Sequence, residues 1–185
     1  MAETKEENRE LVERLKTLLN AGYHGGAWHG PSVLEAIKSI TPEEASFKTP
    51  TVHTAAELIY HITSWRIFTI KRLQGDSDYQ IDNEKKNFGS APKVDEFELE
   101  TLIMELSLSQ DELIKEMDKI NDDFLSEIVT GSEYDYFTLI NGIIHHDIYH
   151  SGQINILKKM SAAYVDNDGD ELSSRYFDDG LGDAF

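Results

Sequence analysis

The chain has 185 residues, contains no cysteine, and carries 17 lysine and arginine residues against 35 aspartate and glutamate residues, a formal net charge of -18 at pH 7. This length predicts one domain with a sizeable core, and the lack of cysteine excludes disulfides and thiolate metal ligands. The acidic charge disfavours binding to nucleic acid or to an anionic membrane surface. A charged N-terminus and the absence of any long apolar run predict a cytoplasmic protein without a signal peptide or membrane span.

Residues 4–21 are predicted to form the first helix, with Gly22 as its expected end. Its core-facing stripe consists of Leu11, Leu15 and Leu18. A loop over residues 23–32 follows, in which three glycines and one proline interrupt the helical pattern. This loop could fold over one end of the bundle, where His24 or His29 could supply a metal ligand, a proton-transfer group or a substrate contact and Trp28 could close over the site. The alternative interpretation is that these histidines lie on the surface or pack within the loop.

Two short helical segments are predicted after this loop. The first opens at Ser32, directly after Pro31. The second opens at Thr41, which is followed by Pro42 in the first turn and by Glu44 three residues on. Two short helical turns are therefore expected after the first long helix.

The segment from residue 54 to residue 73 is predicted to form the second long helix. Thr54 and Glu57 make a capping box at its start, and no glycine or proline occurs before Gly75. One face of this helix carries Leu58, His61, Trp65 and Phe68. His61 therefore stands in the middle of an otherwise apolar line that should face the core.

Residues 75–94 are polar, contain glycine and proline, and lack a helical stripe, which predicts a long connection that covers a site or runs along a bundle. A third long helix is expected from Asp95, with apolar residues at a and d spacing as far as Phe124, and a fourth over residues 134–160. The chain is therefore predicted to be all-α: a four-helix bundle over residues 4–160 with a long crossover connection and short extra helices after the first long one.

The last segment, residues 161–185, is acidic but also contains large apolar side chains. These are Tyr164, Tyr176, Phe177, Leu181 and Phe185. A purely solvating tail would need none of them, so we expect an ordered tail that lies on the bundle or on a partner subunit. The single domain is then expected to span residues 1–185.

A metal half-site is predicted in the fourth long helix. His146 and His150 are one helical turn apart, which places their Cβ atoms roughly 5 to 6 Å from each other on one face. The same line contains Leu139, Ile143, Gln153 and Leu157, so the pair should point into the core. Two imidazoles at this spacing can hold one ion, and His61 is the natural third ligand. The alternative is a set of core histidines satisfied by hydrogen bonds.

Three protein ligands leave a coordination position open, which is the usual layout of a catalytic site. The residues expected around the ligands are Gln153, Tyr149, Asp147 and Trp65, with Trp28 and His29 as candidates from the loop. Gln153 is the preferred partner of a ligand ring because it lies on the ligand face. Asp147 lies about 100° round the helix from His146, so it should contact a neighbouring helix or solvent. Gly152 within the helix predicts close approach of another group.

Three segments resemble the DinB/YfiT-like superfamily. They are AELIYHITSWR around His61, HHDIYHSGQI from His145 to Ile154, and AWHGPSVLEAI from Ala27 to Ile37. The resemblance extends over residues 10–160 and implies a four-helix bundle, a divalent ion held by His61, His146 and His150, and a homodimer. Relatives include thiol-dependent S-transferases, a mycothiol-dependent isomerase and proteins described as metal-dependent hydrolases.

Two function classes follow from these features. The first is an enzyme in which zinc or nickel activates water or a low-molecular-weight thiol, for hydrolysis or S-transfer on a small-molecule substrate. The second is a non-catalytic protein that binds metal or a small ligand in a stress response or in sensing. Neither the metal, the substrate nor the catalytic groups beyond the ion follow from the residues.

Overall fold

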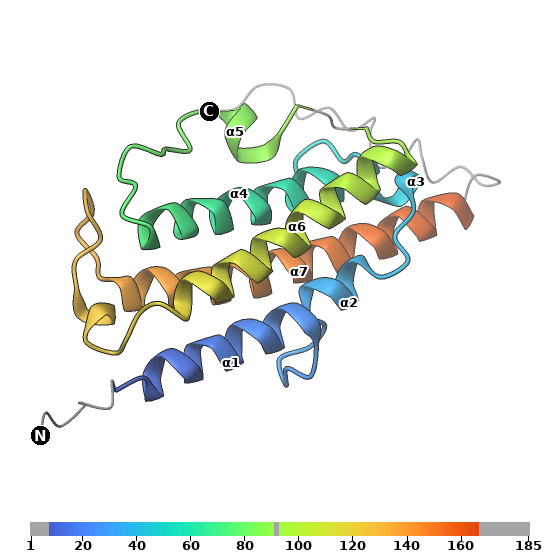
Figure 1. Ribbon diagram of the computed structural model, residues 1–185. Helices are drawn as coiled ribbons and strands as arrows, with labels where there is room; N and C mark the ends of the chain where they lie inside the picture. Colours follow the sequence, from blue (N-terminus) through green and yellow to red (C-terminus); the bar gives the residue numbers. More distant parts are fainter. Residues whose placement is uncertain (1–7, 91–92, 167–185) are drawn as a thin grey trace, which may run out of the picture.

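The computed structural model describes residues 8–90 and 93–166 (Figure 1). This part of the chain is helical, and its strand-like pairing is confined to an isolated bridge between Ile128 and Asp135. The predicted all-α class is therefore confirmed. The elements are α1 Glu10–His24, α2 Val33–Ile37, α3 Pro42–Ala45, α4 Ala55–Leu73, α5 Glu84–Phe88, α6 Glu96–Met117, the 3-10 helix η1 Phe124–Ser126, and α7 Tyr136–Asp166. The predicted ordered tail lies, from residue 167 on, outside the described residues.

The four long helices form a bundle in which α1 and α7 run in one direction and α4 and α6 run in the other (Figure 1). α4 packs against both α6 and α7, and α1 packs against α7. Because α4 and α6 are parallel, residues 74–95 must return along the bundle to join them, and α5 lies in this connection. The predicted long crossover is confirmed, and its helix α5 packs against α4.

Local capping explains why several helices begin where the sequence predicts. α2, α3, α4 and α6 each start with a capping box, in which the N-cap side chain accepts the N3 amide and an N3 glutamate accepts the N-cap amide. The N-cap residues are Ser32, Thr41, Thr54 and Asp95. The two short helices and the start of α4 are thus confirmed, and α4 ends at Leu73 as predicted.

The first helix differs from the prediction in its limits and in its buried face. It begins at Glu10, continues past Gly22 and is followed by Gly25, whose φ of 132° favours glycine. The buried residues are Val12, Leu15, Leu19, Gly22 and Tyr23. Leu11 and Leu18 are 38% and 54% exposed, so the predicted stripe was only partly right. Packing against α7 buries the face that carries Val12, Leu15, Leu19 and Tyr23. The helix continues through Gly22 because a glycine inside a helix costs only about 1 kcal/mol relative to alanine.

The third and fourth long helices also differ from the predicted limits. α6 ends at Met117, and the chain then turns back toward the start of α1. There the Asp122 carboxylate accepts the amides of Leu11 and Val12 at 3.0 and 2.9 Å. The apolar spacing continues through this turn because Phe124 still packs on the core, which made the helix look longer than it is. α7 extends to Asp166, beyond the predicted residue 160.

The apolar core falls into two main clusters toward opposite ends of the bundle, with a polar layer between them. One cluster contains Ile59 of α4 and Ile154 of α7, and the other contains Ile70 of α4 and Ile140 of α7. The buried polar residues of this layer include Arg66 on α4, Gln110 on α6 and Asp147 on α7. The three candidate metal ligands lie on α4 and α7 close to this layer in sequence.

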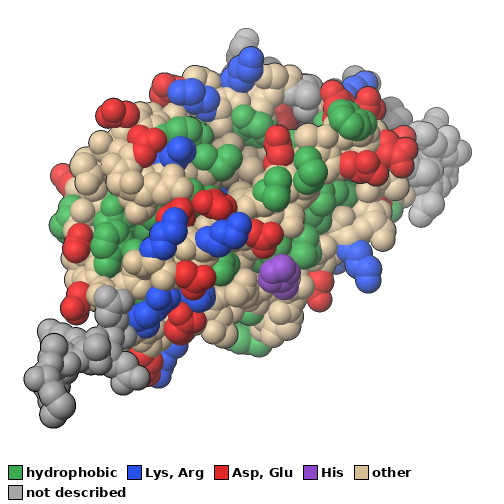
Figure 2. All heavy atoms as spheres, viewed as in Figure 1, with side chains coloured by type: hydrophobic (Ala, Val, Ile, Leu, Met, Phe, Trp, Pro, Cys, Tyr) green, Lys and Arg blue, Asp and Glu red, His purple; other side chains and the backbone are tan. Residues whose placement is uncertain are grey.

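On the face of the bundle drawn in Figure 2, acidic side chains are interspersed with lysine and arginine, and apolar groups lie between them. The charged side chains form ion pairs with one another, as in the 2.5 Å contact between the Lys16 ammonium and the Asp118 carboxylate. None of the helices in residues 8–90 and 93–166 combines the length and the apolar character needed to cross a lipid bilayer.

Candidate metal centre

Three histidines meet between α4 and α7. His61 comes from α4, and His146 and His150 come from successive turns of α7. One ring nitrogen from each lies within 4.8 Å of the others, and the Nε2 atoms of His61 and His146 are 3.0 Å apart. His61 and His150 are each only 7% exposed. The structure therefore brings together the three residues that the sequence analysis combined, in a cluster that could hold a metal ion.

Hydrogen bonds orient two of the three rings. The Nδ1–H of His61 donates to the backbone carbonyl of Asn87 at 3.2 Å, and the Nδ1–H of His150 donates to Oε1 of Gln153 at 2.6 Å. Metal-binding histidines typically use the second nitrogen in this way, which leaves the other lone pair for the metal. Both rings thus present Nε2 toward the common centre.

His146 completes the donor set. Its Nε2 faces the Nε2 of His61, and with His61 protonated on Nδ1 the hydrogen between the two atoms belongs to His146. A cation in place of that hydrogen would receive one lone pair from each of the three rings. The Nδ1 atom of His146 is buried and has no hydrogen-bond partner among the described residues, so it is free to carry the displaced hydrogen. The residues present therefore fit a divalent metal ion.

Burial keeps the three rings neutral. Burial, together with a smaller effect of the neighbouring histidines, lowers the pKa of His61 to about 4 and that of His146 to about 3. The pKa of His150 is also lowered, again chiefly by burial. Because metal ligands must be deprotonated, these rings are available at neutral pH without competition from protons.

This burial predicts a pH-dependent stability for the metal-free protein. As the pH falls from 6.5 toward about 4, the unfolded chain takes up protons on His61 and His146 while the folded chain largely does not, so the free energy of unfolding should decrease. The slope is at most about 1.4 kcal/mol per pH unit for each histidine. Urea denaturation with a chelator at several pH values measures it. The control is the triple variant His61→Gln, His146→Gln, His150→Gln, and equal slopes in both proteins would contradict the prediction.

α5 covers the cluster from outside the bundle. The Phe88 ring lies parallel to the His53 ring at 3.6 Å and to the His61 ring at 4.3 Å, with interplanar angles of 9° and 4°. Two parallel rings at these distances cannot share one face of Phe88, so Phe88 is stacked between them. The indole Nε1–H of Trp65 donates to Oδ1 of Asn87 at 3.2 Å.

Asn87 and Phe88 are absent from the predicted site because the sequence pattern of residues 75–94 predicts no helix there. The signal that could have found α5 is Asn83, whose side chain caps the helix by accepting the amide of Lys86. The more general prediction, that this connection covers a site, agrees with the position of α5.

The other predicted site residues have different surroundings. Gln153 holds His150, and the exposed Tyr149 ring meets the edge of the His150 ring at 4.9 Å. Trp65 lies 6.3 Å from His61 and 6.1 Å from His146, measured between ring centroids, so it walls one side of the cluster. Trp28 is 98% exposed and His29 is exposed as well, and both lie in solvent on the loop between α1 and α2.

Asp147 contacts a neighbouring helix, as the sequence analysis expected, and this contact is buried. Its Oδ2 is 2.5 Å from Nη2 of Arg66 on α4, and both side chains are almost fully excluded from solvent. The Arg66 guanidinium also lies over the Tyr23 ring at 4.5 Å. Arg66 was not singled out from the sequence. Gly152 was expected to allow a close approach, but a Cβ at this position would meet no atom within 4 Å.

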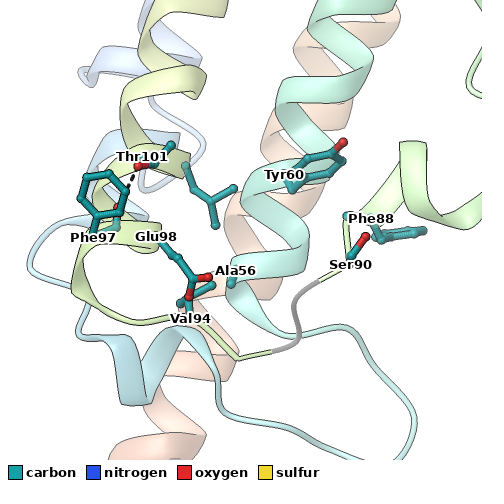
Figure 3. Close-up of a pocket in the computed structure, with 10 residues that line it drawn as sticks. Ala56, Tyr60, Phe88, Ser90, Val94, Phe97, Glu98 and Thr101 are labelled. Atoms are coloured by element: carbon teal, nitrogen blue, oxygen red, sulfur yellow. Dashed lines mark hydrogen bonds between the residues drawn. The ribbon is translucent and has the colours of Figure 1, made fainter.

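An apolar groove of about 280 Å³ lies between α4 and α6 under the crossover connection (Figure 3). Tyr60 and Ala56 of α4 form one side, and Phe97 and Thr101 of α6 form the other. Phe88 lies at its edge and is the lining residue that also touches the histidine cluster. The three histidines themselves do not line this groove.

Comparison with known families gives a match to a model described as the DinB superfamily, over residues 27–154. This range contains His61, His146 and His150. Neither the curated proteins nor the solved structures contain a match to this chain.

Proposed function

Since the chain belongs to the DinB superfamily, we propose that it binds a divalent metal ion through His61, His146 and His150 and uses this ion as an enzyme. The observation that supports the proposal is the convergence of three neutral Nε2 atoms, two of them oriented by hydrogen bonds on the opposite ring nitrogen. An all-imidazole donor set suits zinc or nickel.

Three protein ligands favour a catalytic site over a structural one, because four-coordinate structural sites are closed. When bound, the ion would supply Lewis acidity to a water molecule or to a low-molecular-weight thiol, for hydrolysis or S-transfer on a small-molecule substrate. The chain's own part is to orient the rings through Gln153 and Asn87 and to exclude solvent with Trp65 and Phe88. We assign a substrate contact to Tyr149, and its exposure beside the His150 ring supports this assignment.

Gln153 provides a specific test of how the site is held. In the variant Gln153→Ala the Nδ1–H of His150 loses its acceptor, so zinc affinity should fall by about 10- to 100-fold. The free energy of unfolding should change little, because Gln153 is only half-buried. Zinc titration against a competing chelator measures the affinity. Asn155→Ala is the matched control, since its amide donates to the Ser151 carbonyl on the same helix. Equal affinities in both variants would contradict this role.

The activity itself is tested on untagged protein stripped of metal and reloaded with zinc or nickel. Ester and amide substrates report hydrolysis, and electrophiles with low-molecular-weight thiols report S-transfer. The control is the triple variant with alanine at positions 61, 146 and 150. Turnover that requires both the metal and the histidines supports the proposal, whereas metal binding without turnover favours the second candidate.

That second candidate is a non-catalytic protein that binds metal or a small ligand in a stress response or in sensing. It is favoured by the burial of the cluster, because His61 and His150 are each 7% exposed and Phe88 lies against His61. A sensor needs only to exchange its ion, whereas an enzyme must also admit a substrate. Substrate-dependent turnover therefore separates the two.

We further propose that the protein acts in the cytoplasm as a homodimer. Large apolar side chains are exposed along two helices, a pattern that a protein interface would cover. They are Met104 and Leu108 on α6, and Ile156 and Met160 on α7. Sedimentation analysis tests the proposal, and a monomer at micromolar concentrations would contradict it.

A further inference from the structure

α5 has little packing of its own to hold it in place. It has five residues, and none of them is buried. Its contacts with the bundle include those of Asn87 and Phe88 with His53, His61 and Trp65, and Phe88 also packs against the apolar cluster that contains Ile59 and Ile154. The position of α5 and the orientation of the His61 ring are therefore coupled.

The hydrogen bond from His61 to Asn87 depends on where the imidazole carries its hydrogen. The Asn87 carbonyl can only accept, so the 3.2 Å contact requires the hydrogen on Nδ1. A neutral imidazole has one N–H, and a cation bound at Nε2 forces that hydrogen onto Nδ1. Without a cation, His61 can instead carry its hydrogen on Nε2 and donate it to Nε2 of His146. The lone pair of His61 Nδ1 then faces a lone pair of the Asn87 carbonyl oxygen, and the hydrogen bond between these two atoms is lost.

Phe88 fixes the plane of the same ring. Stacked between His53 and His61, it prevents rotation of the His61 imidazole away from the cluster. The backbone that follows is close to α4, since a Cβ on Gly89 would lie 3.2 Å from the Tyr60 ring. α5 can therefore hold both the tautomer and the plane of His61 from outside the bundle.

We propose that Asn87 and Phe88 are positioning residues of the metal centre, and that the ion in turn fastens α5 over it. This inference rests on the proposed metal binding at His61. If ion binding stabilises α5 in its packed position, thermodynamic linkage requires that α5 in this position raises the affinity for the ion by the same factor.

The experiment uses the full chain carrying Trp28→Phe, which leaves Trp65 as the remaining tryptophan of the two. Stoichiometric zinc should slow hydrogen exchange of amides 84–89 by about tenfold or more and change Trp65 emission. Phe88→Ala should weaken zinc binding by about tenfold and abolish the zinc-induced protection. Phe88→Tyr, which keeps the stacked ring, should restore both. Phe97→Ala is the control because it removes the same ring from the opposite side of the groove (Figure 3).

The outcomes separate this inference from the proposed function. Zinc binding with no change in exchange at residues 84–89 would overturn the inference and leave the metal site intact. The same holds if Phe88→Ala and Phe97→Ala bind zinc equally well. If the wild-type protein binds no more zinc than the variant with alanine at positions 61, 146 and 150, both the metal site and this inference are wrong. Melting of the chelator-treated variants checks that each one is folded.

Discussion

Replacing His150 with alanine is expected to weaken zinc binding by about 100-fold or more. Structural zinc sites bind with about 10 to 16 kcal/mol, so one of three ligands accounts for about 3 kcal/mol or more, and each 1.4 kcal/mol is tenfold in affinity. The loss should be large because His150 presents an oriented Nε2 to the cluster through its bond to Gln153. Metal analysis and chelator competition on untagged protein measure the change.

His145→Ala is the matched control for this prediction. It removes an exposed imidazole from the same helix, next to His146, that is not part of the cluster. Zinc should raise the free energy of unfolding of the control by about 4 kcal/mol at a free concentration 1,000 times its Kd, and it should stabilise His150→Ala by no more than about 1.4 kcal/mol at the same concentration, because the affinity of this variant is at least 100-fold weaker. Equal metal content in the two variants would rule out the three-histidine site.

Removal of one partner from the Arg66–Asp147 pair is expected to destabilise the protein by about 3 to 5 kcal/mol. Asp147→Ala leaves the Arg66 guanidinium, which has no exposed surface, without its carboxylate. Nε and Nη1 of Arg66 already have no hydrogen-bond partner among the described residues, so the loss of Asp147 would leave a further unpaired donor on the buried guanidinium. Urea denaturation in the presence of a chelator measures the loss apart from any contribution of metal.

The double variant Arg66→Met, Asp147→Leu tests whether the destabilisation comes from the unpaired buried charge or from the loss of packing around it. Replacing both charges with apolar side chains of similar size is often neutral or stabilising, so most of the stability should return. Lys48→Ala is a surface control, because its ion pair with Glu57 is half-exposed and should contribute no more than about 1 kcal/mol. If Asp147→Ala were as mild as Lys48→Ala, the pair would not matter for stability.

Much of the fold could be predicted because its signals are local. The capping boxes at Thr41 and Thr54 involve residues three apart, and the apolar spacing of α4 repeats with each turn. α5 was missed because a five-residue helix without a buried face leaves no apolar period to detect. The buried face of α1 was predicted only in part, because two faces of this helix have apolar residues at helical spacing. One carries Leu11, Leu15 and Leu18, and the other, which the structure buries, carries Val12, Leu15 and Leu19. Contact with α7 then decided between them.

The candidate site divides in the same way. The sequence by itself determined that His146 and His150 share one face of a helix and that His61 interrupts the apolar line of another, because both statements concern neighbours within a few residues. Only the tertiary structure decided that the rings meet, with Nε2 of His61 3.0 Å from Nε2 of a residue 85 positions away. It also decided that Asn87 and Phe88 cover His61 and that Arg66 pairs with Asp147. These contacts depend on the packing of α4 against α7 and on the path of the crossover connection, which no local pattern encodes.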